Sequence, residues 1–305
     1  MANLKDLRSF GQVSWNLVLA IIVINVSVFS FGFDQSVFST IQAMDGNLSL
    51  HISFECVLNF AYVAYERQFG TYNPTTEAWA FTAEHLSFLN SFGLPAKCIG
   101  AAMGLLVAEK FGRRPSYIAM QFIVIIGIAV SYSAQNFGQA LAGRMIVQCF
   151  VGWDNFLAPM FLAEISPPAL RGGIVVVYVF AHILGSLICS FVTLATASYE
   201  GDSSWQIPLA SMFTFPLFVL VFFWFIPESP RWLVRKGQNE RAIKHLCWLQ
   251  GSSFSKQEAE VEVNTLHRSI QSDMETKGQW TDFLKGSNRV RLDITFLFNE
   301  NKFEG

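Results

Sequence analysis

The sequence predicts an all-α membrane protein, in which a bundle of six transmembrane helices is followed by short cytoplasmic helices. Hydrophobic residues make up 52% of the 305 residues and charged residues make up 14%, against about 25% in typical soluble domains. Six apolar segments are long enough to cross a bilayer, which takes roughly 20 residues of α-helix. Basic residues gather at alternate segment ends. The lipid bilayer is therefore an expected partner of this chain.

The segments predicted to span the bilayer cover approximately residues 15–36, 87–108, 116–134, 140–162, 173–197 and 206–226. Lys5 and Arg8 precede the first segment, as basic residues precede the apolar core of a signal peptide. Its apolar run is longer than such a core, and no small-residue cleavage site follows it. We therefore expect the first segment to be a retained span.

The positions of Lys and Arg predict the orientation. One set of span ends carries the basic residues Lys5, Arg8, Lys110, Arg113, Arg114, Arg171, Arg231, Arg235 and Lys236. The opposite ends carry Arg67 and little else, with acidic Glu200 and Asp202 in one short loop. Because loops rich in Lys and Arg stay in the cytoplasm, we expect a multi-pass plasma-membrane protein with both termini cytoplasmic.

The domain organisation follows from these spans. We expect a cytoplasmic N-terminus over 1–14, the six-helix bundle over 15–226 with a long outer loop over 37–86, a cytoplasmic helical segment over 227–286 and an irregular C-terminus over 287–305. Residues 238–250 and 256–271 are predicted to be short amphipathic helices. Ala242, Ile243, Leu246 and Leu249 recur on one face at helical spacing.

No enzymatic chemistry is expected. The five cysteines are dispersed, with no metal or disulfide spacing: Cys56, Cys98, Cys149, Cys189 and Cys247. The sequence contains no nucleophile–base pair and no glycine-rich phosphate loop. We expect neither a metal nor a cofactor. The net charge of −2 does not indicate nucleic acid, and none is expected as a partner.

Charged motifs punctuate the spans in a fixed order. They are Glu109-Lys110-Phe111-Gly112-Arg113-Arg114-Pro115, Ala142-Gly143-Arg144, Glu164-Ile165-Ser166-Pro167-Pro168-Ala169-Leu170-Arg171-Gly172 and Pro227-Glu228-Ser229-Pro230-Arg231-Trp232-Leu233. In this order they resemble the sugar-porter family of the major facilitator superfamily, in its fungal type, over roughly residues 15–286. A full porter has twelve spans, so the resemblance is to the N-terminal six-helix bundle of a major facilitator fold.

The resemblance implies transport of a sugar or related polyol by alternating access, coupled to protons. One half cannot enclose a substrate, because alternating access rocks two halves around a central site. Three alternatives stay open. The chain is an inactive fragment, or two copies assemble into a complete porter, or it is a non-transporting sensor or decoy that associates with a full-length relative.

The resemblance also implies a cytoplasmic gating network of charges at the span ends. Its candidates are Glu109, Arg113, Arg114, Glu164, Arg171, Glu228 and Arg231. Arginine donates several hydrogen bonds to carboxylates or to helix carbonyls. The alternative is that these basic residues only fix the topology, which does not explain a Glu at each neighbouring helix end. Glu109 departs from the family, which usually has Asp there.

Four charged residues lie inside the predicted spans, where each is costly and a candidate for function. At about 1.5 Å of rise per residue, Asp34 and Arg144 lie near the outer surface. Lys97 and Asp154 lie about 15–18 Å from the cytoplasmic helix ends, close to the midplane. The depths predict two pairs, Asp34 with Arg144 and Lys97 with Asp154. The second pair is either a feature of the substrate site or a bridge in helix packing.

Asp34 and Arg144 match family positions, and the resemblance implies that residues at these positions couple transport to protons. Proton-coupled members of the family carry Asp after the Gly-aromatic pair of the first span, here Gly32-Phe33. An Arg that changes partners would let such a carboxylate accept a proton. The alternative is a structural ion pair.

Sugar binding needs amides, hydroxyls and aromatic faces in a mostly apolar cleft. The resemblance puts Val179 where the family has a substrate-binding glutamine, and Val makes no side-chain hydrogen bonds. His182 lies one turn further on the same face, either as a replacement or as a packed residue. The other substrate-binding candidates are Phe31, Gln35, Gln148 and Asn155.

Two stretches depart from the resemblance. Residues 46–64 lengthen the first outer loop with a semi-apolar run that contains the sequon Asn47-Leu48-Ser49. We hypothesise that this run is a retained intron, which a mature transcript still containing it would contradict. At the other end, Ile294–Phe298 is only a brief apolar run, where the resemblance implies a seventh span.

Overall fold

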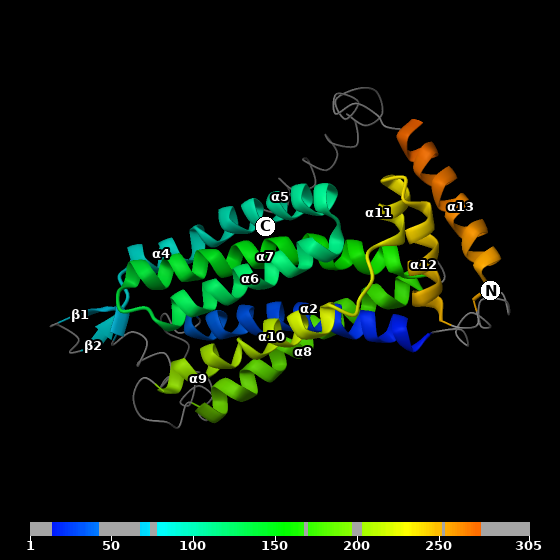
Figure 1. Cartoon of the computed structure of the whole chain (residues 1–305). Helices are drawn as coiled ribbons and strands as arrows, with labels where there is room; N and C mark the ends of the chain where they lie inside the picture. The colour runs from blue at the N-terminus through cyan, green and yellow to red at the C-terminus, as the bar shows by residue number, and fades with distance from the viewer. Residues whose placement is uncertain are drawn as a thin grey trace, which may run out of the picture.

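Six helices that are long and apolar enough to cross a membrane form the body of the protein in the computed structural model (Figure 1). The structure describes residues 14–42, 68–73, 78–167, 170–196, 203–251 and 254–275. The predicted all-α membrane fold with six spans is confirmed, and each predicted segment overlaps one of the helices. The stretch 46–64, with Asn47 and Cys56, and the C-terminal stretch 287–305 lie outside the described residues.

The spanning helices follow one another with short connections. They are α2 (Trp15–Gln42), α5 (Gly93–Phe111), α6 (Arg113–Tyr132), α7 (Phe137–Ile165), α8 (Arg171–Thr196) and the pair α9 (Ser203–Ser211) and α10 (Thr214–Phe223). The short helix α4 (Ala83–Ser91) leads into α5. Gly112, with φ of 107°, makes the turn between α5 and α6 in a backbone region that favours glycine.

The two ends of the bundle carry different small elements. At one end lies an antiparallel pair of short strands that the sequence did not predict, β1 (Thr71–Asn73) and β2 (Ala78–Ala80). At the other end lie α11 (Pro230–Arg235), α12 (Asn239–Gln250) and α13 (Lys256–Glu275) (Figure 1). Ala242, Leu246 and Leu249 of α12 are buried, as their helical spacing predicts.

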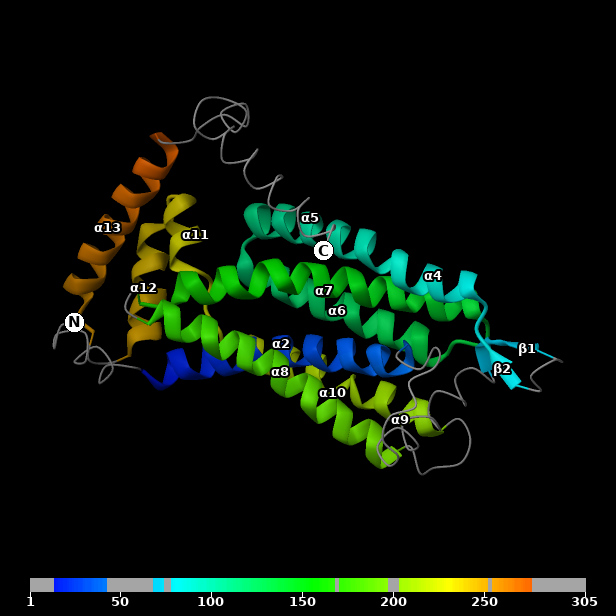
Figure 2. The same ribbon diagram turned by 180° about the vertical axis from the view of Figure 1, so that it is seen from behind.

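Helix α7 is the centre of the bundle. It packs against α5 on one side, and against α6 and α2, while α8 lies along α2 (Figure 2). Lipid gives helices no hydrophobic reason to associate, so close packing of small residues has to hold them together. Two glycines serve this purpose where α5 meets α7, because a Cβ at Gly100 would collide with the Cys149 carbonyl and one at Gly152 with the Lys97 carbonyl.

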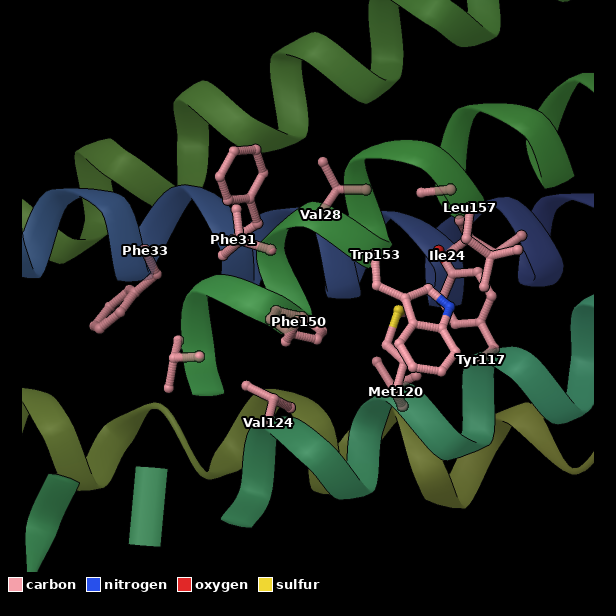
Figure 3. Packing of buried hydrophobic residues seen from close by; sticks show 14 of the residues in the cluster. Ile24, Val28, Phe31, Phe33, Tyr117, Met120, Val124, Phe150, Trp153 and Leu157 are labelled. Atoms are coloured by element: carbon pink, nitrogen blue, oxygen red, sulfur yellow. The ribbon is translucent and has the colours of Figure 1, made fainter. Parts of the chain in front are cut away.

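The bundle interior is filled by large side chains. Figure 3 shows Trp153 of α7 beside Met120 and Tyr117 of α6, all fully buried. The Tyr117 ring also stacks on Phe223 of α10, with centroids 4.6 Å apart. Trp153 Nε1 donates to Ser116 Oγ at 3.0 Å, which satisfies its polar atom within the apolar core.

Candidate functional site

A buried ion pair joins the first and fourth spans. Nη1 of Arg144 on α7 donates to both carboxylate oxygens of Asp34 on α2, at 3.0 Å each. Asp34 is 1% exposed, and the Arg144 side chain is 12% exposed. Gln148, one turn along α7, donates from Nε2 to Asp34 Oδ2 at 3.2 Å. Both carboxylate oxygens therefore have partners, as a buried negative charge requires.

The substrate-binding candidates lie in two different environments. Gln148 is buried and turned towards Asp34, and Phe31 is buried with its ring 4.4 Å from that of His182. Gln35 and Asn155 are exposed. Val179, where the resemblance places a glutamine, is 47% exposed.

A polar and aromatic strip runs across α2, α8 and α7, and it is defined by five side chains: Gln35, Phe31, His182, Tyr178 and Asn155. Gln35 and Phe31 are four residues apart on α2, as are Tyr178 and His182 on α8, so each pair shares a helix face. The Phe31–His182 ring contact joins α2 to α8. Tyr178 closes the strip by donating its hydroxyl proton to Asn155 Oδ1 at 3.1 Å. Tyr178 was not among the candidates, although its position one turn before His182 was a signal.

The predicted pair of Lys97 with Asp154 is wrong. Among the described residues no ion pair joins them, and Asp154 Oδ1 accepts instead from Ser27 Oγ at 3.0 Å and from the Tyr117 hydroxyl at 3.3 Å. Lys97 and Asp154 do lie at similar levels along the bundle, because Gly152 packs on the backbone of Lys97. Asp154 lies two residues later, about 200° further around the helix at 3.6 residues per turn, and so faces away from α5.

At the end of the bundle that carries α11–α13, a second buried ion pair joins α6 to α7. Arg113 donates from Nε to Glu164 Oε2 at 2.8 Å and from Nη2 to Glu164 Oε1 at 2.7 Å. Ser229 Oγ donates to the same Glu164 Oε2 at 2.6 Å. Two parallel bonds from one guanidinium are among the strongest charge-assisted contacts. Ser229 was not among the candidates, although it stands in the motif that contains Glu228.

Glu228 ties the connection after α10 to the start of α6. Its carboxylate accepts from the backbone nitrogens of Arg113 at 2.8 Å, of Ser229 at 2.9 Å and of Arg114 at 3.2 Å. Burial raises the pKa of Glu228, while the backbone donors of Ser229, Arg114 and Arg113 oppose that rise. The Glu228 carbonyl in turn lies 3.1 Å from His245 Nδ1 on α12, so the network reaches the helices that follow the bundle.

The remaining network candidates are less closely joined. Arg114 donates to the Trp224 carbonyl at 2.7 Å, and Glu109 lies 3.9 Å from Arg235 on the exposed surface. Arg171 forms no ion pair within the described part of the chain. It lines a cleft of about 680 Å³ between the bundle and α12 and α13, together with Glu164, Leu249, Glu258 and Glu262. In the same described part, no cluster of side chains could hold a metal ion.

Relatives in sequence and structure agree with this architecture. The quinate permease of Neurospora terricola is 32% identical over 227 residues, which are 69% of this chain and 41% of the permease. The high-affinity hexose transporter ght4 of Schizosaccharomyces pombe is 25% identical, over 74% of this chain and 41% of its own length. The proton:xylose symporter XylE, bound to 6-bromo-6-deoxy-D-glucose, matches the fold with a TM-score of 0.71 at 24% identity, over 90% of this chain and 57% of that one.

The chain thus spans less than half the length of these two sequence relatives. Within that length the match to the family is continuous. The family model described as "Sugar (and other) transporter" covers residues 19–299, which include five of the spanning helices whole and the first one from Leu19 onward. This chain therefore belongs to the family of sugar and other transporters.

Proposed function

We propose that this chain supplies the N-terminal six-helix half of a transporter that couples uptake of a sugar or related polyol to protons. The observation that carries the proposal is the buried Asp34, whose two carboxylate oxygens are bonded to a single Arg144 nitrogen. A proton arriving at Asp34 would neutralise the carboxylate and release Arg144 to another partner. That exchange would link proton binding to movement between α2 and α7.

The strip from Gln35 to Asn155 supports a polyhydroxylated substrate. Quinate and hexoses, which the named relatives carry, share several hydroxyl groups on a ring. Gln35, Asn155, Tyr178 and His182 offer amide, hydroxyl and imidazole partners for hydroxyl groups, and Phe31 offers an aromatic ring. With Val179 in place of a glutamine, His182 and Tyr178 would supply the hydrogen bonds of the fifth span.

The cytoplasmic network supports alternating access. The network binds the ends of α6 and α7 to the connection after α10 through Arg113, Glu164, Glu228 and Ser229, so these ends would move as one body. The exposed ends of the strip, Gln35 and Asn155, leave the proposed substrate site open on one side. A second set of helices would have to close it, contributed by a second copy or by a full-length relative.

In the proposed orientation, α11–α13 and both termini lie in the cytoplasm. The end of the bundle that carries these helices is rich in basic residues: Lys110, Arg113, Arg114, Arg231 and Arg235. Loops rich in basic residues are retained in the cytoplasm. The plasma membrane is the proposed location, where a sugar porter would take up its substrate.

Uptake measurements test the proposal. The 305-residue chain is expressed in a host that lacks its own sugar carriers, and its surface level is measured first. Radiolabelled hexoses, disaccharides, polyols and quinate-like acids are then supplied at two pH values. We expect uptake to rise at acid pH and to fall at least tenfold in Asp34→Asn, which cannot exchange a proton.

Glu260→Gln is the matched control, because it removes an exposed carboxylate of α13 and should leave uptake unchanged. Acid-stimulated uptake that survives in Asp34→Asn would contradict the coupling role of Asp34. A lack of uptake at both pH values, despite normal surface levels, would contradict transport by this chain alone. That result would favour the alternatives of an inactive fragment, or of a non-transporting sensor or decoy that associates with full-length relatives.

A further inference from the structure

Asp154 is a carboxyl group in the middle of the bundle, and no cation among the described residues balances it. It is 0% exposed, and no ion pair reaches it from the described residues. Its Oδ1 accepts from Ser27 Oγ and the Tyr117 hydroxyl, and Gln121 Nε2 donates to Ser27 Oγ at 3.1 Å. Its other oxygen, Oδ2, is buried with no hydrogen-bond partner.

This uneven pattern distinguishes Asp154 from Asp34. An ionised carboxylate spreads its charge over both oxygens, and in an apolar interior both need partners. Asp34 meets that requirement with Arg144 and Gln148. At Asp154 both donors converge on Oδ1 alone, as they would on the carbonyl oxygen of a neutral acid. The unbonded Oδ2 is then the hydroxyl oxygen, which carries the proton.

The groups packed around Asp154 offer no alternative neutralisation. Helix α2 presents Ser27 and α6 presents Tyr117, neither of which carries positive charge. On α8 the titratable neighbour is Tyr178, which bonds to the adjacent Asn155. On α5 the charged group is Lys97, whose backbone contacts Gly152 on the other side of α7 and whose charge interacts with those of Arg144 and Asp34.

We propose that Asp154 is a second proton-binding site, protonated at Oδ2 and separate from the Asp34–Arg144 pair. A proton taken from the aqueous phase forms the O–H bond and leaves the interface of α2, α6 and α7 uncharged. Its release would leave a negative charge without a partner in that interface. The proton is therefore bound while the three helices stay packed, and it leaves only when they part and water reaches Oδ2.

Infrared spectroscopy of the purified full-length chain in lipid tests this inference, and it requires no transport activity. A protonated carboxyl group has a carbonyl stretching band that an ionised carboxylate lacks. At neutral pH we expect such a band in the unaltered chain, its loss in Asp154→Asn and its retention in Asp34→Asn. An Asp154→Asn spectrum with all carboxylic-acid bands unchanged would overturn the proposal.

Two further variants keep the test decisive if Asp154→Asn fails to fold. Tyr117→Phe and Ser27→Ala each remove one hydrogen bond to Oδ1, so each should move the Asp154 band to higher frequency while the carboxyl group stays in place. Circular dichroism and gel filtration verify that each variant is folded. Folded variants that show no band shift would mean that no protonated carboxyl accepts these bonds, and would equally overturn the proposal.

Discussion

Single residues show that this bundle compensates its buried charges in different ways. Arg113 and Glu164 neutralise each other through a bidentate pair whose side chains are 3% and 7% exposed. Asp34 relies on one Arg144 nitrogen and on Gln148. Among the described residues, Asp154 has only hydroxyl donors, as suits the uncharged acid proposed for it. Since an uncompensated buried charge is costly, removing one partner should destabilise the bundle by a different amount in each arrangement.

The largest loss of stability is expected at Arg113. Arg113→Ala would leave Glu164 buried without its cation, and we expect a loss of about 3–5 kcal/mol in the free energy of unfolding, as for other broken buried pairs. Arg235→Ala is the control, because its 3.9 Å contact with Glu109 is exposed and should be worth about 0–1 kcal/mol. Denaturant titration of the purified chain in mixed micelles measures both, and equal losses would contradict the assigned difference.

The two predicted charge pairs also show how much of the side-chain pairing could be predicted from the sequence. Asp34 and Arg144 were predicted to pair from charge and depth, and they do. Lys97 and Asp154 were matched by the same argument and do not pair. Depth follows from counting residues, but the direction of a side chain around its helix depends on which neighbour that helix packs against. The contact of Gly152 with Lys97 settles that direction, and no hydropathy pattern reveals it.

At the scale of elements, the spans were predictable to within a few residues, because the bilayer fixes the length of an apolar helix. The break in the sixth span was missed, although its cause is in the sequence. Pro216 has no N–H to donate to the Met212 carbonyl, and α9 ends at Ser211 before α10 begins at Thr214. The packing partners of each helix could not be read from hydropathy, since lipid and protein neighbours are equally apolar.

Contact between α5 and α7 gives a test of element packing. Gly152→Ala would place a methyl group against the Lys97 carbonyl, and we expect the overpacking to cost about 1–3 kcal/mol of stability. Gly138→Ala lies in the same helix, α7, where an added Cβ meets nothing within 4 Å. It should be neutral or stabilising by up to about 1 kcal/mol. Thermal unfolding of both variants measures the difference, and a destabilised Gly138→Ala would undermine the packing argument.

At the scale of the whole molecule, the described helices leave one side of the bundle uncovered. Helix α8 buries only 17% of its most apolar stretch, against 61% for α2 and for α7, and exposes large residues such as Phe180, Ile183 and Phe191. Lipid tails and a second set of helices would cover these side chains equally well. Gln35 and Asn155, the exposed ends of the strip, are different, because polar groups at membrane depth face protein or water. They therefore face either a water-filled cleft or a second set of helices, as the proposed transporter requires.

The two ends of the molecule give its last prediction. In a chain whose own cysteines are replaced by alanine, we expect Gln257→Cys on α13 to react with a membrane-impermeant maleimide only after the cells are permeabilised. Gln135→Cys, between α6 and α7 at the opposite end, should react in intact cells, and both positions are exposed. The physical reason is that basic residues gather at the end with α11–α13, and loops rich in basic residues are generally retained in the cytoplasm. Labelling of Gln257→Cys in intact cells would contradict the proposed orientation.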